Sequence, residues 1–187
     1  MLYLASASPR RKEILERAGF SFTAMPTQAD ESFPAGEQPP PREAAAALAR
    51  RKALALEESP AYREVSRPGD EILAADTVVD LDGRLLGKPA GEAEAAAMLR
   101  ALSGRAHLVH TGFCLTGPRG TFSTAETTRV EFYPLSEEEI LAYIASGEPM
   151  DKAGAYGIQG RGMRFVRRIE GDFFNVMGLP VSCLRAL

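Results

Sequence analysis

The chain has 187 residues, of which 45% are hydrophobic and 25% charged, and its net charge is −3. This length suits one hydrophobic core, so we expect a single α/β domain over residues 1–187. The acidic balance disfavours a nucleic-acid-binding protein, and because no run of 18 apolar residues occurs, no membrane-spanning helix or membrane partner is predicted.

The first elements are short. Residues 2–5 form an apolar run that is typical of a buried strand. Ser8 is a good N-cap and Pro9 suits the first helical position, so a helix is predicted to begin there and to end at Gly19. A second strand is expected over residues 20–25.

The middle of the chain holds the clearest elements. Residues 26–41, rich in Pro, Gln, Gly and acid, predict a long ordered loop, and loops of this length are often functional. Residues 41–58 predict the strongest helix, since they are nearly all Ala, Leu, Arg and Glu. Another loop is expected over 59–70, followed by a central strand at 71–81 and a hairpin turn at Asp82-Gly83.

Helices and strands continue to alternate after the hairpin. A helix is predicted over 92–102, and two long antiparallel strands over 105–116 and 121–133. Ser136 to Glu139 form a capping box before a helix over 140–146.

The C-terminal quarter is less regular. Residues 147–162 predict an irregular segment, 164–169 a strand and 180–187 a last helix. The whole pattern predicts an α/β fold with a mixed, partly antiparallel sheet flanked by helices and arranged in two lobes.

Lysine usage points to chemistry. The chain has eighteen arginines and only four lysines, and three of these, Lys52, Lys88 and Lys152, lie in short motifs. Positions that keep Lys against this bias are typical of sites that need a compact ammonium group, for example beside a phosphate oxygen. Chance remains the alternative explanation.

The segment Ser6-Ala7-Ser8-Pro9-Arg10-Arg11 lies between a predicted strand and the start of a helix. Backbone N–H groups at a helix N-terminus favour anions, and the two hydroxyl and two guanidinium groups add donors. This pattern predicts a phosphate site. An ordinary capped surface helix explains it equally well.

Asp76 is unusual because apolar residues surround it in a predicted strand. An unpaired buried carboxylate is costly, so Asp76 must be exposed at the strand end, paired with a cation or bound to a metal. It could take a proton from water or bind Mg²⁺. The alternative is a turn-capping role, which we assign to Asp80 and Asp82.

Two further segments could contribute to a site. Glu31 follows Asp30 in the long loop and could bind a metal, although a solvated loop acid is the simpler interpretation. Residues 151–160 combine glycines, an Asp-Lys pair, Tyr156 and Gln159. Gln159 offers both a donor and an acceptor, which suits reading of a nucleobase edge, whereas the alternative is a glycine-rich connector.

The histidines and cysteines predict no site. His107 and His110 have odd spacing on a predicted strand and therefore face opposite sides, so we expect both to be structural. Cys114 and Cys183 lack metal or disulfide spacing and lie in apolar surroundings, which predicts buried thiols in a reducing cytosol.

These segments, in this order, resemble the Maf family of nucleoside triphosphate pyrophosphatases. The resemblance covers essentially the whole chain, and its first and sixth stretches are the most specific. The matching stretches are Leu-Ala-Ser-Ala-Ser-Pro-Arg-Arg (4–11), Asp-Glu (30–31), Arg-Lys-Ala (51–53), Ala-Asp-Thr-Val-Val (75–79), Gly-Lys-Pro (87–89), Ser-Gly-Glu-Pro-Met-Asp-Lys-Ala-Gly-Ala-Tyr-Gly-Ile-Gln-Gly (146–160) and Gly-Asp-Phe-Phe-Asn-Val-Met-Gly-Leu-Pro (171–180).

The resemblance implies hydrolysis of a nucleoside triphosphate between its α and β phosphates, with Mg²⁺ or Mn²⁺ required. It implies a fold shared with the inosine triphosphatases, with the site in a central cleft between two lobes, and a cytoplasmic homodimer. Within the family, the branch that acts on dTTP and UTP is similar to this chain at Arg11, Thr77 and Gln159.

The resemblance also suggests a role for each matching residue. Asp76 is expected to be the catalytic base and Glu31 the metal ligand, alone or with Asp76. The other residues are expected to bind substrate: Ser6, Arg11, Lys52 and Lys88 its phosphates, Thr77 and Gln159 its base. Two alternatives stay open, a non-catalytic nucleotide-binding regulator of cell division and a housecleaning enzyme for damaged nucleotides.

Overall fold

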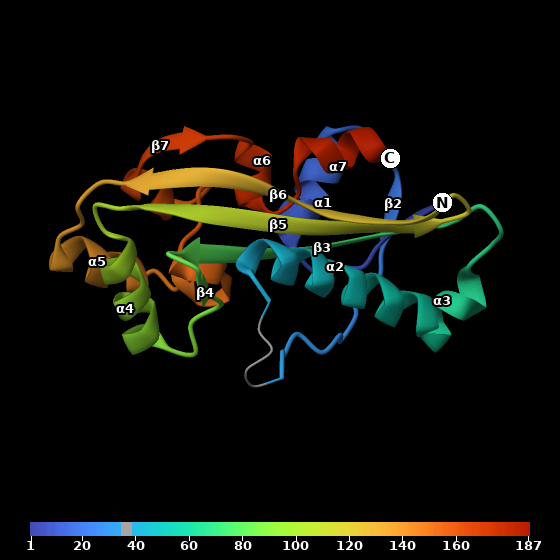
Figure 1. The fold of residues 1–187 in the computed structure, drawn as a ribbon, viewed down its shortest axis with the longest axis horizontal. Coiled ribbons are helices and arrows are strands. Elements are labelled where there is room, and N and C mark those ends of the chain that lie inside the picture. Colours follow the sequence, from blue (N-terminus) through green and yellow to red (C-terminus); the bar gives the residue numbers. More distant parts are fainter. Residues whose placement is uncertain (35–38) are drawn as a thin grey trace.

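A single seven-stranded sheet organises the computed structural model, which describes residues 1–34 and 39–187 (Figure 1). Its strand order is β2-β1-β3-β5-β6-β7, and β4 also pairs with β3. Strand β1 is parallel to β2 and β3, whereas the other pairs are antiparallel. The strands are β1 (Leu2–Leu4), β2 (Phe22–Ala24), β3 (Glu71–Leu81), β4 (Arg84–Leu86), β5 (Ala106–Gly117), β6 (Gly120–Phe132) and β7 (Val166–Glu170).

Helices cover both faces of this sheet. Figure 1 shows α1, α6 and α7 on the opposite side of the sheet from α2 and α3. The α-helices are α1 (Pro9–Arg17), α2 (Pro41–Glu58), α3 (Pro60–Val65), α4 (Glu92–Leu102), α5 (Glu137–Ile144), α6 (Phe173–Met177) and α7 (Val181–Ala186); the 3₁₀ helices are η1 (Glu148–Asp151), η2 (Ala153–Ala155) and η3 (Arg161–Phe165). The expected mixed sheet flanked by helices is therefore confirmed.

Helix α2 lies unusually close to the sheet. Its face toward β3 and β5 carries the buried Ala44, Ala45, Ala49 and Ala53, which bring the helix backbone near the strands. At the contact, a Cβ atom added to Gly112 would lie only 2.1 Å from the Ala45 carbonyl oxygen. Small side chains on α2 and on β5 thus set the distance between this helix and the sheet.

A gap in the sheet lies beside β3. Strand β1 pairs with residues 71–73 of β3, and β4 pairs with residues 79–81. Between them, residues 74–78 have no strand partner on that side among the described residues, although β5 pairs with them on the other. Ligands of open α/β sheets commonly bind where parallel strands end, and this gap lies just beyond the carboxyl end of β1.

Most predicted elements are present. Helix α2, strand β3 and helix α4 have the predicted bounds, and the capping box of Ser136 and Glu139 is formed. The long loop has no helix or strand in its described part, while residues 35–38 of that prediction lie outside the described residues. In the part that the structure describes, no helix is long and apolar enough to cross a membrane.

Two local predictions are wrong, and one helix was not predicted. The expected loop over 59–70 contains α3, because Ser59 caps the amide of Tyr62 at 3.2 Å and Pro60 fits the first helical turn. Helix α6 was not expected. Ser8 does not cap α1 with its side chain; instead the Ser8 amide donates to the Ser6 hydroxyl at 3.1 Å.

Candidate active site

A cleft of about 730 Å³ opens along the gap beside β3. Its walls come from the β1–α1 turn, β3, α2, the turn after β4 and the segment 151–159. Five cationic and three acidic side chains line it: Arg10, Arg11, Lys52, Lys88 and Lys152, with Glu31, Asp76 and Asp151. The cleft is therefore locally cationic in a chain whose net charge is −3, which suits a polyanionic ligand.

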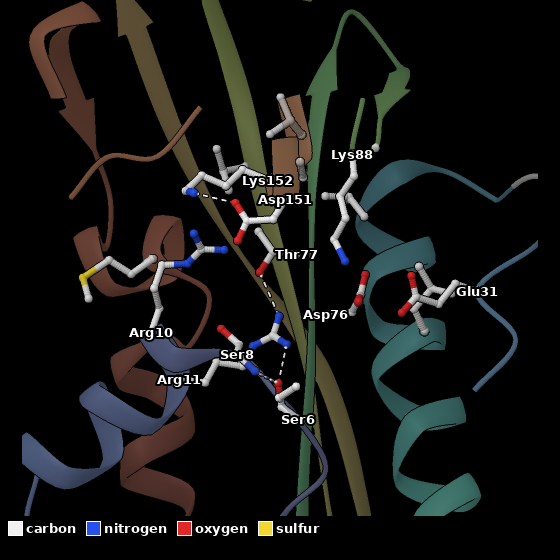
Figure 2. Close-up of a pocket in the computed structure, with 18 of the residues that line it drawn as sticks. Ser6, Ser8, Arg10, Arg11, Glu31, Asp76, Thr77, Lys88, Asp151 and Lys152 are labelled. Carbon is white, nitrogen blue, oxygen red and sulfur yellow. Dashed lines mark hydrogen bonds and ion pairs between the residues drawn. The ribbon is translucent and has the colours of Figure 1, made fainter. Parts of the chain in front are cut away.

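Strand β3 divides the chemistry of the cleft into two sides. Asp76 and Thr77 are consecutive, so their side chains leave the strand on opposite faces. Figure 2 shows Asp76 facing the side of Glu31 and α2, while Thr77 faces the side of Arg11 and Asp151. One cleft can contain both residues because it passes through the gap in the sheet.

On the α2 side, Lys52 joins two carboxylates. Its Nζ donates to Asp76 Oδ1 and lies 2.8 Å from Glu31 Oε1. Asp76 is only 8% exposed, so this contact neutralises a carboxylate that would otherwise be buried alone. Of the three possibilities that the sequence left open for Asp76, the structure shows pairing with a cation, and the partner is Lys52.

Glu31 remains ionised in this arrangement. Burial alone would raise the pKa of its carboxyl group, but the hydrogen bond from Lys52 and the charges of Lys52, Lys88 and Arg11 together hold that pKa below its usual value. Lys88 follows β4, and Figure 2 shows its side chain pointing toward Asp76. Two lysines thus face the two carboxylates.

On the α1 side, Arg11 connects three segments that are distant in sequence. Its guanidinium donates to the Gly178 carbonyl at 2.8 Å, to the Ser6 hydroxyl at 3.1 Å and to the Thr77 hydroxyl at 3.3 Å. Burial lowers the pKa of Arg11, and the charge of Asp76 opposes that shift. Three of the Arg11 donors are therefore used in hydrogen bonds within the protein. The phosphate-binding hypothesis did not predict these internal bonds.

The structure brings all eight sequence-predicted residues to one cleft. Those residues are Ser6, Arg11, Glu31, Lys52, Asp76, Thr77, Lys88 and Gln159. Asp30 lies apart on the surface, where its carboxylate accepts from the Ser32 amide at 2.9 Å. The arrangement meets the geometric condition of the hypothesis, while the role of each residue stays a prediction.

Three charged residues of the cleft, Arg10, Asp151 and Lys152, lay in motifs that the sequence singled out but were not among the predicted site residues. Lys152 donates to the Glu148 carbonyl at 2.7 Å and to Asp151 Oδ1 at 2.6 Å. Burial would raise the pKa of Asp151, but its bond to Lys152 and the charges of Lys152 and Arg10 lower it. The paired arginines at 10–11 and the Asp-Lys pair at 151–152 were the available signals.

The residues outside the cleft behave as expected. His107 donates to or accepts from Tyr156 on one face of β5, and His110 contacts Asp80 and Thr127 on the other, so the two do not share a ligand. Asp80 accepts from the Gly83 amide in the hairpin turn at 2.7 Å. Cys114 and Cys183 are buried free thiols.

Glu31 and Asp76 are the residues best suited to a divalent cation. Both already contact one ammonium group, so their oxygens can face a single cation. Among the described residues, no group of three or more His, Cys, Asp or Glu side chains could hold a metal. This fits Mg²⁺ or Mn²⁺ bound by one or two carboxylates with the remaining positions left to substrate phosphates and water.

Comparison with known proteins adds the following matches. A family model described as Maf-like protein matches residues 1–187. The dTTP/UTP pyrophosphatase of Thermus thermophilus is 50% identical over 187 residues, which are 100% of this chain and 92% of that protein. The proteins of the same name from Geobacillus sp. and Thermococcus gammatolerans are 51% and 49% identical over 97% and 98% of this chain, and 92% and 93% of theirs.

Among solved structures, the Staphylococcus aureus Ham1 protein has a TM-score of 0.46 and 15% identity, covering 70% of this chain and 71% of that one.

Proposed function

This chain belongs to the Maf family, and from that premise we propose that it hydrolyses dTTP and UTP to the monophosphate and pyrophosphate. One observation carries the proposal: a buried carboxylate, Asp76, is held by Lys52 inside a cleft with a surplus of cations. The curated relatives that share about half of the sequence are named for this activity, and their similarity spans the whole chain.

The triphosphate would lie along the cationic lining. A nucleoside triphosphate carries about four negative charges near neutral pH, so positioning and charge neutralisation account for most of the catalysis of such reactions. Lys52 and Lys88 would bind phosphate oxygens on the α2 side of β3, and Ser6 with the remaining Arg11 donors on the α1 side. The first turn of α1 also lines the cleft and adds the positive end of a helix.

Asp76 would activate the attacking water. Its carboxylate can accept a proton from water as that water attacks the α-phosphorus, and the bond to the β-phosphate then breaks to release pyrophosphate. The hydrogen bond from Lys52 fixes the Asp76 carboxylate before substrate arrives, so little reorganisation is needed in the reaction.

A divalent cation held by Glu31 and Asp76 would neutralise charge on the phosphates when bound. In that state Lys52 would keep its hydrogen bond to Asp76, give up its contact with Glu31 and donate to a phosphate oxygen. The ion pair of the free protein thus already holds both carboxylates around one cationic position.

The base would be recognised by Thr77 and Gln159. Apolar side chains also line the cleft and offer a surface for a planar ring: Val79, Val109, Tyr156, Ile158, Val176 and Met177. The Thr77 hydroxyl also bonds with Thr111 at 2.9 Å and with Arg11, so its orientation is fixed.

A panel of triphosphates tests this proposal. The purified protein is incubated with dTTP, UTP, dCTP, the purine triphosphates, inosine triphosphate and modified pyrimidine triphosphates, with Mg²⁺, with Mn²⁺ and with chelator. Release of pyrophosphate and monophosphate from dTTP and UTP, dependent on the cation, is the expected result. Binding of dTTP without any pyrophosphate would favour a non-catalytic regulator, and preference for inosine or modified bases would favour a housecleaning enzyme.

We further propose that residues 1–187 form one domain and act as a homodimer in the cytoplasm. The continuous sheet from β2 to β7 supports one domain, and the two buried free thiols suit a reducing compartment. Light scattering of the purified protein measures the assembly.

A further inference from the structure

The segment that carries Gln159 is wrapped around one carboxylate, that of Glu148 in η1. Glu148 Oε2 accepts from the Arg161 amide at 2.8 Å, and Oε1 accepts from the Gly162 amide at 3.3 Å. Gln159 lies two residues before the first of these amides. The backbone on the C-terminal side of Gln159 is therefore tied directly to Glu148.

Tyr143 of α5 ties down the other side of the segment. Its hydroxyl donates to Glu148 Oε1 at 2.9 Å and accepts from the Gly157 amide at 3.0 Å. Gly157 lies two residues before Gln159, so bonds on both sides of Gln159 converge on the same carboxylate. Burial raises the pKa of the Tyr143 hydroxyl, which therefore keeps the proton that it donates.

Three glycines make room for this arrangement. A Cβ atom at Gly160 would lie 2.3 Å from Glu148 Oε1, and one at Gly157 would lie 2.7 Å from the Lys152 Cε. At Gly162 it would lie 2.8 Å from the Tyr143 hydroxyl. The glycine-rich sequence of this segment is thus explained by close packing around Glu148 and its neighbours, and not by flexibility.

Glu148 does not itself line the cleft, whereas Gln159, Gly157 and Lys152 do. Its own backbone carbonyl accepts from Lys152, so the same residue also places a cation of the cleft. We propose that Glu148, supported by Tyr143, is a positioning residue that sets base discrimination by fixing Gln159. This inference rests on the proposed function, because it concerns recognition of the pyrimidine base at that same site.

A double-mutant cycle tests the inference. Glu148→Gln keeps the size of the side chain but replaces one carboxylate oxygen by an NH₂ group. That NH₂ group cannot accept a hydrogen bond, so one of the two backbone N–H groups loses its acceptor. Leaving a buried N–H group without an acceptor costs free energy of a size that corresponds to about a tenfold change. We therefore expect the ratio of kcat/KM for dTTP to kcat/KM for dCTP to fall about tenfold. We expect KM for dTTP to rise while kcat changes by less than about twofold, since Asp76 and Lys52 lie on a different wall.

The cycle separates positioning from simple structural support. In a Gln159→Ala background, Glu148→Gln should change the dTTP/dCTP ratio by less than about twofold, because residues that act as a unit are not additive. The proposal would be overturned if the effects of Glu148→Gln and Gln159→Ala on the dTTP/dCTP ratio simply multiplied in the double mutant. It would also be overturned if Glu148→Gln lowered kcat and left that ratio unchanged. Glu64→Gln in α3, an exposed position in a helix that does not line the cleft, is the matched control and should leave both constants unchanged.

Two measurements keep the test informative if activity or folding is lost. Hydrogen exchange of the Gly157, Arg161 and Gly162 amides should be faster in Glu148→Gln than in Glu64→Gln, and equal rates would contradict the proposal. Tyr143→Phe is a second variant that removes the bridging hydroxyl and should shift discrimination in the same direction. If the wild type releases no pyrophosphate, the proposed function fails, and the same cycle is then read from dissociation constants of dTTP and dCTP.

Discussion

The two walls of the cleft are built in different ways. The wall formed by β3, α1 and α2 is held by strand ladders and buried alanines, and it carries Asp76 and Lys52. The second wall, residues 147–162, has no strand and is held by side-chain bonds centred on Glu148. The proposed reaction is thus placed on the wall built from backbone ladders and packed helices, and the proposed base recognition on the wall held mainly by side-chain bonds.

The largest effect is expected on the first wall, at Asp76. Asp76→Asn keeps an acceptor for Lys52 but removes the general base, whose contribution to rate is typically 10²–10⁴-fold. We expect turnover of dTTP to fall by about that factor while the melting temperature stays nearly unchanged. Initial rates with a pyrophosphate-coupled assay and a thermal melt measure the two quantities.

Asp82→Asn is the matched control for Asp76→Asn. Asp82 lies exposed in the hairpin turn at φ 55°, a conformation that Asn also tolerates. The control should keep full activity, and a fully active Asp76→Asn enzyme would remove Asp76 from the mechanism.

The close approach of α2 to the sheet predicts the next effect. Gly112 pairs with Asp76 in the β3–β5 ladder and faces Ala45, where an added Cβ would meet backbone that cannot easily move. Gly112→Ala should therefore destabilise the protein by about 3 kcal/mol or more, and push Lys52 away from Asp76. Urea unfolding checks the stability, with Gly87→Ala as the control because its Cβ would meet nothing within 4 Å.

The sequence predicted the first wall well because its signals are local. The composition of residues 41–58 and the apolar run of 71–81 are enough to define α2 and β3. The sequence could not show that Asp76 and Thr77 would share one cleft from opposite faces of β3. That result depends on where β1 and β4 stop pairing, which is a non-local property of the sheet.

The second wall was predicted only as irregular. Its residues were recognised by motif, but the role of Glu148 depends on which amides meet its carboxylate after folding. The same holds for Arg11, whose partner Gly178 is 167 positions away. Charged residues in a motif can be found from sequence, whereas their assignment to ligand or to neighbouring backbone requires the structure.

His107 joins β5 to the second wall and predicts a pH effect. It lies on β5 and its ring hydrogen-bonds with Tyr156 of the second wall at 2.8 Å. Burial lowers the pKa of His107 to about 4, so below its unfolded pKa of 6.5 the unfolded chain binds a proton that the folded chain does not.

Stability should therefore fall as the pH drops from about 6.5 to about 4, with a contribution of roughly 3 kcal/mol from His107. His110, whose pKa burial also lowers, adds to the fall in the same direction. Urea unfolding of the wild type and of His107→Gln, measured across this pH range, isolates the contribution of His107. The free energy of unfolding should depend less steeply on pH in His107→Gln. Parallel curves would show that His107 does not titrate on unfolding in this range.

The smallest effect is expected on the second wall, at Gly160. A Cβ atom there would meet the Glu148 carboxylate, which is the end of a flexible side chain and can move, unlike the backbone that faces Gly112. Gly160→Ala should thus cost only about 1 kcal/mol of stability. The displaced Glu148 carboxylate would then no longer accept the hydrogen bond from the Arg161 amide, so Gln159 would be less well positioned. KM for dTTP should therefore rise severalfold while kcat is retained.

Gly160→Ala and Gly112→Ala introduce the same methyl group, the first in the second wall and the second where β5 packs against α2 of the first wall, so together they measure the contrast. We expect the first to change KM and discrimination with little loss of stability, and the second to lower stability and kcat together. Gly91→Ala, where an added Cβ would meet nothing within 4 Å, controls for the substitution itself. If Gly160→Ala instead lowered the melting temperature as much as Gly112→Ala, the 147–162 segment would be as rigidly built as the sheet, and its separate role in recognition would lose its physical basis.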